Sequence, residues 1–154
     1  MTVTVGERAP AFTLVDQDRN PVSSESLAGS KAIIVFIPFP FTGTCESELC
    51  DLRDRLNQFE RLDASVVAIT CDTAPTNKAW SDANAFGFPV LSDFWPHGAT
   101  AQAYGVFNDA LGCANRSTFV LDEDGVISAV ITSDSLGIAR ESDHYLAALE
   151  AIEG

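Results

Sequence analysis

Two kinds of hydrophobic pattern follow one another along the chain. Residues 32–37 and 65–71 are continuous runs of β-branched, aromatic and small apolar side chains, which is typical of strands covered on both faces. Residues 45–59 instead carry apolar side chains at spacings of three and four, which predicts an amphipathic helix directly after the first strand. The change of period indicates a buried strand that leads through a short loop into a helix.

The same reasoning, applied to the rest of the chain, predicts a regular alternation of strands and helices. The expected elements are a helix at 75–86, a strand at 89–91, a helix at 99–104, strands at 117–121 and 126–131, and a helix at 142–152. Residues 122–125, Asp-Glu-Asp-Gly, are a strong hairpin signal because glycine tolerates the positive φ that such a turn needs. We therefore expect one domain over residues 1–154, of α/β class, with a mixed central sheet and helices on both faces.

Composition narrows the classes of function. The 154 residues are 46% hydrophobic and 20% charged, as in an ordinary globular protein, and no apolar run approaches the roughly 20 residues of a membrane span. The formal net charge of −13 opposes binding to nucleic acid or to anionic membranes. The first residues show neither a basic segment nor an apolar signal segment, so we expect a cytoplasmic protein whose cysteines stay reduced.

Cys45 is the first candidate for chemistry, because it stands where the first strand leads into the predicted helix. Gly43 or Thr44 is expected to cap this helix, and Glu46 and Glu48 suit its positive first turn. Unpaired N–H groups and the helix dipole favour an anion there, and thiolate is the nucleophilic form of cysteine. Position alone also fits a small buried hydrophobic residue, so both interpretations stand at this point.

The other cysteines and the histidines give weaker signals. Cys71 ends a predicted buried strand and is expected to pack in the core. Cys113 follows a glycine in a predicted loop, three residues before Arg116, so both a packing role and a place near Cys45 are open. A metal site is not expected, because the chain has no Cys-x-x-Cys and its two histidines, His97 and His144, stand apart.

Residues 38–45, Pro-Phe-Pro-Phe-Thr-Gly-Thr-Cys, resemble the peroxiredoxin active-site pattern Pro-x-x-x-Thr-x-x-Cys. The opening at 6–14 and the segment Arg-Ser-Thr-Phe-Val-Leu at 116–121 fit the same family in the same order. Residues 91–98 and 103–108 resemble the alkyl hydroperoxide reductase E group in particular. The resemblance implies a thioredoxin-like fold, a thiol-dependent peroxidase without haem, flavin or metal, and a homodimer.

The resemblance also assigns roles within the site. It implies that Cys45 attacks the near oxygen of a hydroperoxide and becomes a sulfenic acid. Thr42 would offer a hydroxyl, with backbone N–H groups as further donors, and Arg116 would stabilise the thiolate and position the peroxide. Pro38 would shape the loop and shield the sulfur from water. Without the family, Arg116 is interpreted as a solvated strand-end arginine and Pro38 as the end of a strand.

Cys50 departs from the usual one-cysteine pattern of the E group, and its spacing from Cys45 resembles the Q-type, bacterioferritin-comigratory peroxiredoxins. That spacing implies a resolving cysteine that forms a disulfide with Cys45; the alternative is an idle Cys50 and an external thiol. Residues five apart on a helix have Cα atoms roughly 8.6 Å apart, beyond the roughly 7 Å that a disulfide allows. Bridging therefore requires the helix to unwind, with Gly43 as a hinge, and we expect resolution to be slower than peroxide attack.

Further partners follow from the same motif. Residues 42–45 resemble a thioredoxin Cys-x-x-Cys whose first cysteine is replaced, which argues against a general disulfide reductase. The electrons must come from a thiol partner: thioredoxin, a glutaredoxin-like protein or a low-molecular-weight thiol.

Residues 94–96, Phe-Trp-Pro, are expected at an interface. A redox sensor or chaperone-like protein, whose contacts change when Cys45 is oxidised, is the alternative of another class.

Overall fold

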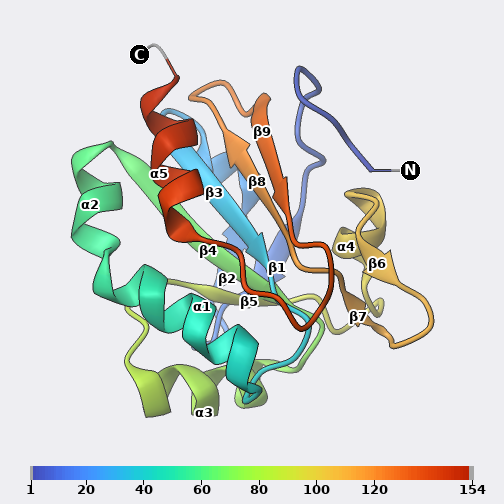
Figure 1. Ribbon diagram of the computed structural model, residues 1–154. Coiled ribbons are helices and arrows are strands. Elements are labelled where there is room, and N and C mark those ends of the chain that lie inside the picture. The colour runs from blue at the N-terminus through green and yellow to red at the C-terminus, as the bar shows by residue number, and fades with distance from the viewer. Residues whose placement is uncertain (1, 153–154) are drawn as a thin grey trace.

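A computed structural model describes residues 2–152, and its centre is a seven-stranded sheet with the order β2-β1-β5-β4-β3-β8-β9 (Figure 1). The strands are β1 (Thr13–Val15), β2 (Pro21–Ser23), β3 (Lys31–Phe36), β4 (Ala64–Thr70), β5 (Val90–Ser92), β6 (Phe107–Asn108), β7 (Cys113–Ala114), β8 (Ser117–Leu121) and β9 (Ile127–Thr132). The helices are the 3-10 helix η1 (Ser24–Leu27) and α1 (Gly43–Asp54), α2 (Leu56–Arg61), α3 (Ala74–Asn84), α4 (Ala99–Ala103) and α5 (Ser142–Glu150). The predicted mixed sheet of a thioredoxin-like α/β fold is confirmed.

The two continuous apolar runs form the middle of this sheet. β3 pairs in parallel with β4 and antiparallel with β8, so that Ile33 lies opposite Val66 on one side and Val120 on the other. β4 also pairs in parallel with β5. Strands in such a position are covered on both faces, which explains why they are apolar at every residue rather than at alternate ones.

Each face of β3 contributes to a different hydrophobic core, because successive side chains of a strand point to opposite faces. One core contains Ile33, Val35 and Ile37 together with residues of α1, α2, α3 and α5. The other contains Ala32, Ile34 and Phe36, with Ala101 of α4 and Tyr104 just after it. Helices therefore cover both faces, and Figure 1 shows α1, α2 and α5 on the near face.

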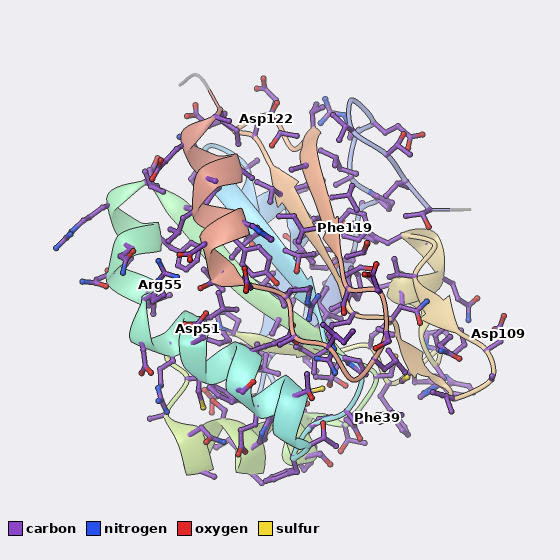
Figure 2. All side chains as sticks on the ribbon, in the orientation of Figure 1. Phe39, Asp51, Arg55, Asp109, Phe119 and Asp122 are labelled. Carbon is purple, nitrogen blue, oxygen red and sulfur yellow. The ribbon has the colours of Figure 1, made fainter. Side chains whose placement is uncertain are left out.

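The helix predicted over residues 45–59 is wrong as a single element. It starts at Gly43 and is interrupted at Arg55, whose ψ of 11° separates α1 from α2. The Arg55 side chain, labelled in Figure 2 beyond Asp51, binds the start of α5 through the Asp143 carboxylate at 2.7 Å and the Ser142 hydroxyl at 2.8 Å. The apolar stripe continues across the interruption because α2 still packs on the sheet.

The cap of α1 also differs from the expectation. The extended residue before the helix is Thr42, whereas Gly43 and Thr44 already lie inside the first turn. Thr42 Oγ1 donates to the carbonyl oxygen of Phe39 at 2.7 Å instead of accepting from a helix N–H. The expected caps Gly43 and Thr44 are therefore wrong by one or two residues.

The short strands β1, β2, β6 and β7 were not predicted, whereas β5, which is also short, was expected at residues 89–91. One of them corrects an expectation, since Cys113 lies in β7 and not in a loop, paired across from Asn108 of β6. Over residues 2–152, no helix combines the length and the hydropathy needed to cross a bilayer.

Candidate active site

The loop after β3 and the first turn of α1 build the candidate site. The first helical hydrogen bond runs from the Glu46 N–H to the Thr42 carbonyl oxygen at 2.9 Å. The N–H groups of Gly43, Thr44 and Cys45 precede that bond, so the positive end of the helix dipole lies at Cys45. In Figure 2 the label of Phe39 marks this end of the sheet, and Asp122 marks the opposite end.

The Cys45 sulfur lies beside a guanidinium group. Arg116, immediately before β8, places Nη2 3.3 Å from Cys45 Sγ, in hydrogen-bonding geometry. Both residues are buried, with 1% of Cys45 and 4% of Arg116 exposed. The interpretation of Arg116 as a solvated strand-end residue is therefore wrong. The arrangement provides a buried cation for a thiolate.

A second arginine and a glutamate complete the charged part of the site. The carboxylate of Glu48, on α1, accepts from Nη1 of Arg116 and, at 2.9 Å, from both Nε and Nη2 of Arg140. It also accepts from the backbone N–H of Arg140 at 2.6 Å. Arg140 in turn donates to Thr118 Oγ1 at 3.0 Å and to the Phe36 carbonyl oxygen at 2.9 Å. One buried carboxylate is thus shared by two buried guanidinium groups.

Sequence reasoning missed this network. Glu48 was expected only to suit the helix dipole, although its position three residues after Cys45 places it on the same face of the helix. Arg140 gave no local signal, because it lies 92 residues from Glu48 and outside every predicted element. Arg140 reaches α1 because the chain turns back toward that helix after β9.

The charges of the network reinforce one another. Burial by itself raises the pKa of Glu48, but hydrogen bonds from Arg140 and the charges of both arginines outweigh it and hold that pKa below the ordinary value. Burial likewise opposes the charge of Arg116, yet the Glu48 carboxylate and the Cys45 sulfur raise the pKa of Arg116. The guanidinium beside Cys45 is therefore charged near neutral pH.

Thr42 and Pro38 lie in the loop that leads to Cys45. Thr42 is exposed, and its hydroxyl hydrogen is engaged by the Phe39 carbonyl in this form. A hydroxyl oxygen keeps lone pairs that accept hydrogen bonds. Pro38 is buried and lies two residues after the end of β3.

A segment after β9, residues 133–140, closes the other side of the site. The Leu136 carbonyl oxygen accepts from Nε and Nη2 of Arg116 at 3.1 and 2.6 Å, and Thr44 Oγ1 donates to the Gly137 carbonyl oxygen at 3.5 Å. A cavity of about 350 Å³, lined by Asn115, Arg116, Ser117 and residues of this segment, lies against the arginine. Cys45 is covered in this form, so a peroxide reaches Sγ only when the covering segments move slightly.

Cys50 lies on the same helix as Cys45 but has a different environment. It is half-buried, and its Sγ lies 3.7 Å from Oδ1 of Asn84 on α3. Burial raises the pKa of the Cys50 thiol; the Arg53 charge lowers it, and the carboxylates of Glu46 and Asp54 raise it further. The structure brings Cys45 and Arg116 together and leaves Cys50 as a protonated thiol facing another helix.

The remaining two cysteines are buried thiols. Burial, with the nearby Asp93 carboxylate, raises the pKa of Cys71 to about 12. Burial also raises the pKa of Cys113, and the charge of Cys45 adds to the effect. Cys71 is packed as expected, and Cys113 lies near enough to Cys45 to be influenced by its charge.

Comparison with known proteins places this geometry in a family. Residues 5–130 match the model of the AhpC/TSA family. The chain is 50% identical over 126 residues to alkyl hydroperoxide reductase E of Mycobacterium tuberculosis, which covers 81% of this chain and 82% of that protein. It is 34% identical over 129 residues to the chloroplastic peroxiredoxin Q of Sedum lineare, covering 83% of this chain and 68% of that protein.

Solved protein structures support the same family assignment. The crystal structure of peroxidoxin BcpB from Mycobacterium tuberculosis matches with a TM-score of 0.88 at 30% identity, over 99% of each chain. That of Enterococcus faecalis AhpC matches with a TM-score of 0.87 at 28% identity, over 98% of this chain and 92% of the other. A buried cysteine at a helix start, facing a buried arginine, on a fold with these relatives leads to one conclusion: the chain belongs to the AhpC/TSA family and is a peroxiredoxin, an enzyme with thiol-dependent peroxidase activity.

Proposed function

We propose that this peroxiredoxin reduces hydrogen peroxide and small organic hydroperoxides through a sulfenic acid at Cys45, which Cys50 then resolves as an intramolecular disulfide. The observation that supports the first step is the 3.3 Å contact between Arg116 Nη2 and Cys45 Sγ in a buried site. A thiolate held in this way needs no metal or organic cofactor to attack an O–O bond.

In the first step, the Cys45 thiolate attacks the near oxygen of the hydroperoxide. An S–O bond forms and the O–O bond breaks, so sulfur is oxidised by two electrons and the peroxide is reduced. The departing oxygen takes a proton and leaves as water or as an alcohol. Charge moves from sulfur onto that oxygen, so donors placed near both atoms favour the transition state over the ground state.

The surrounding residues supply those donors. Arg116 balances the charge on sulfur and offers N–H groups toward the bound peroxide, while Thr42 contributes its hydroxyl once the loop adjusts. Pro38 limits the entry of water. Glu48 and Arg140 do not react; they hold the Arg116 side chain in one orientation through the shared carboxylate.

In the second step, Cys50 as thiolate attacks the sulfur of the Cys45 sulfenic acid. An S–S bond forms, the S–O bond breaks, and hydroxide leaves and is protonated to water. An external thiol then reduces the disulfide in two exchange steps. The position of Cys50 on the same helix supports this route, although the helix must unwind between the two cysteines first.

A one-cysteine mechanism is the second candidate, and one observation favours it. Cys50 faces α3 and its pKa is raised, so few Cys50 thiolates are present near neutral pH. In this mechanism, a thioredoxin, a glutaredoxin-like protein or a low-molecular-weight thiol attacks the Cys45 sulfenic acid directly.

One experiment separates the two mechanisms. The reduced protein and a Cys50→Ser variant are each treated with one equivalent of hydrogen peroxide, and every sulfur is then mapped by mass spectrometry. The resolving mechanism predicts a Cys45–Cys50 disulfide in the wild type and a sulfenic or sulfinic acid at Cys45 in the variant. A free Cys50 in the oxidised wild type would reject resolution by Cys50, and a Cys45–Cys113 bridge would transfer the role to Cys113.

Turnover separates the peroxidase from a redox sensor. With excess peroxide and a suitable thiol, the enzyme consumes many equivalents of peroxide. A sensor or chaperone-like protein would stop after one equivalent.

We further propose that the protein is cytoplasmic and that it forms a homodimer through an exposed aromatic surface. The Trp95 side chain is 80% exposed, and Phe94 and Leu111 are also exposed. His97 links the two loops that carry them, since its ring nitrogens lie 3.1 and 2.7 Å from the carbonyl oxygens of Phe94 and Gly112. Exposed apolar groups gathered in this way are typical of protein–protein contacts.

Measuring the mass of the protein by sedimentation tests the proposed homodimer. The wild type is expected to sediment as a dimer and Trp95→Ala as a monomer, whereas Val15→Ala, which changes an exposed residue of β1, leaves the mass unchanged. A wild-type monomer at micromolar concentration would contradict the dimer.

A further inference from the structure

The first turns of α1 are tied to α3 by side chains that the peroxidase chemistry does not use. Oε1 of Glu46 accepts from Nε1 of Trp80 at 3.1 Å and from Nδ2 of Asn84 at 3.1 Å. The same Asn84 side chain faces Cys50 through its oxygen, with Oδ1 3.7 Å from Cys50 Sγ. We call this group, Glu46 and Cys50 of α1 with Trp80 and Asn84 of α3, the α1–α3 latch.

The α3 half of the latch is rigidly held. Trp80 is fully buried and packs edge-on against Phe86, with ring centroids 5.0 Å apart. Asn84 Nδ2 also donates to the Trp80 carbonyl oxygen at 3.1 Å, and the Asn84 carbonyl oxygen accepts from Arg53 Nη1 at 2.7 Å. Burial of Trp80 and the bond within α3 hold the groups that bind Glu46 and Cys50, and Arg53 of α1 adds a further tie to Asn84.

The latch opposes the rearrangement that a Cys45–Cys50 disulfide needs. The helix between the two cysteines must unwind, because their Cα atoms are about 8.6 Å apart in a helix and a disulfide allows about 7 Å. Glu46 lies inside that segment and Cys50 ends it. Unwinding thus breaks the bonds from Glu46 to Trp80 and Asn84, and attack by Cys50 breaks its contact with Asn84.

We propose that the α1–α3 latch sets the rate of the Cys45–Cys50 disulfide step, with Asn84 as the positioning residue that contacts both Glu46 and Cys50 of the unwinding segment. This inference rests on the proposed resolving role of Cys50. When the latch is closed, the Cys45 sulfenic acid persists and is available to an external thiol or to a second peroxide. When it opens, Cys50 is released from Asn84 at the same moment that the helix unwinds.

The latch is separate from the groups that act on the peroxide. Trp80 and Asn84 lie on α3, whereas Arg116 and Arg140 reach Cys45 and Glu48 from the chain on either side of the β8–β9 hairpin. Changing the amide of Asn84 also leaves every formal charge in place. The disulfide step and the peroxide step are therefore expected to respond differently to the same substitution.

Asn84→Ala is the decisive variant, because it removes both side-chain ties to α1 at the last residue of α3, where alanine is a good helix former. Peroxide attack is measured as the loss of free Cys45 thiol, and disulfide formation by rapid quenching and mass spectrometry. The disulfide step should accelerate about tenfold, the effect of weakening hydrogen bonds to a charged group. The rate of peroxide attack should change less than twofold.

Asn57→Ala, at an exposed asparagine of α2, is the matched control and should leave both rates unchanged. Trp80→Phe removes the other donor to Glu46 and should accelerate the disulfide step in the same direction. It gives an independent test if Asn84→Ala does not fold.

The outcomes are distinguishable. Equal disulfide rates in the wild type, Asn84→Ala and Trp80→Phe overturn the latch while leaving the resolving mechanism intact. An oxidised wild type with Cys50 free overturns the resolving mechanism and the latch together. Failure of the wild type to react with peroxide overturns the proposed chemistry at Cys45 itself. A parallel rise or fall of both rates shows a general structural effect and also rejects the proposal.

Discussion

Cys45 and Cys50 lie on one helix, five residues apart, yet their surroundings differ in almost every respect. Cys45 lies in the first turn, beside a buried guanidinium group, with the unpaired N–H groups of the helix start around it. Cys50 lies more than a turn later and faces the side-chain amide of Asn84, with carboxylates nearby that raise its pKa. Cys45 thus contacts a buried guanidinium directly, whereas burial raises the pKa of Cys50 and the nearby charges of Arg53, Glu46 and Asp54 act in opposite directions.

The comparison shows that the neighbours, rather than the cysteine, decide reactivity. Cys45 is matched with a positive charge that arrives from a distant strand, and this charge is itself stabilised by Glu48. In the proposed resolving mechanism, Cys45 attacks the peroxide first, and Cys50 becomes available only after α1 rearranges.

The largest effect is expected when Cys45 itself is changed. Cys45→Ser removes the sulfur that lies 3.3 Å from Arg116 Nη2 and should abolish thiol-dependent peroxide consumption, measured in the presence of excess dithiol. Cys50→Ser should retain peroxide attack at a rate within twofold of the wild type. Equal loss of activity in both variants would contradict the distinction between the two cysteines.

Removal of the cation should be the next largest effect. Arg116→Met keeps much of the side-chain volume but removes the donor to Cys45 Sγ, and peroxide attack should slow by about 10²–10³-fold, as for loss of a donor in other active sites. Stopped-flow measurement of Cys45 oxidation checks this. Arg61→Met, at an exposed residue of α2, serves as the control and should be neutral.

Glu48 should affect stability as well as rate. Glu48→Gln leaves the buried guanidinium groups of Arg116 and Arg140 without their shared negative charge, and the free energy of unfolding should fall by about 3 kcal/mol. Urea unfolding of the reduced protein measures the change. The surface variant Asp54→Asn, which removes an exposed ion pair with Arg53, should change it by less than about 1 kcal/mol.

The lowered pKa of Glu48 predicts a smaller, pH-dependent effect. The folded-state pKa lies below the unfolded value of about 4.3, so the stabilisation is complete above that pH and is lost as pH falls through the folded pKa. The difference in unfolding free energy between the wild type and Glu48→Gln should therefore shrink as pH is lowered from 6 to 3. A difference that stays constant over this range would show that the charge of Glu48 is not the cause.

The smallest effect is expected at Cys71. Because burial raises the pKa of this thiol to about 12, native Cys71 should resist alkylation by iodoacetamide at pH 8 while Cys45 reacts. Cys71→Ala should leave the rate of peroxide attack within twofold of the wild type. Rapid alkylation of Cys71 in the folded protein would show that the core opens easily at the end of β4.

Much of the fold was predictable, because the central elements are long enough for their periodicity to be evident. Residues 32–37 and 65–71 indicated two buried strands, and β3 and β4 agree with them to within a residue at each end. The strands β1, β2, β6 and β7, of two or three residues each, were missed, although β5, with three residues, was predicted. The interruption at Arg55 was missed because it depends on contacts with α5 and not on the local sequence.

The residues of the candidate site also fall into those that the sequence indicated and those that it did not. The motif of residues 38–45 pointed to Cys45, Thr42 and Pro38, since all lie within one continuous segment. The resemblance of residues 116–121 also pointed to Arg116 beside Cys45. The pairing of Glu48 with Arg140 and the tie between Cys50 and Asn84 were not indicated, and they join residues 92 and 34 positions apart. No local pattern records such contacts.

The amino-acid sequence by itself determined the α/β class, the order of the principal strands and helices, and the place of Cys45 at the start of a helix, because these depend on hydrophobic periodicity and local backbone preference. Only the tertiary structure decided which charges surround the two cysteines of α1. That outcome depends on how β8, α3 and the segment after β9 pack against one helix, and a charge inside a protein is stabilised by whatever partners the packing brings within hydrogen-bonding distance.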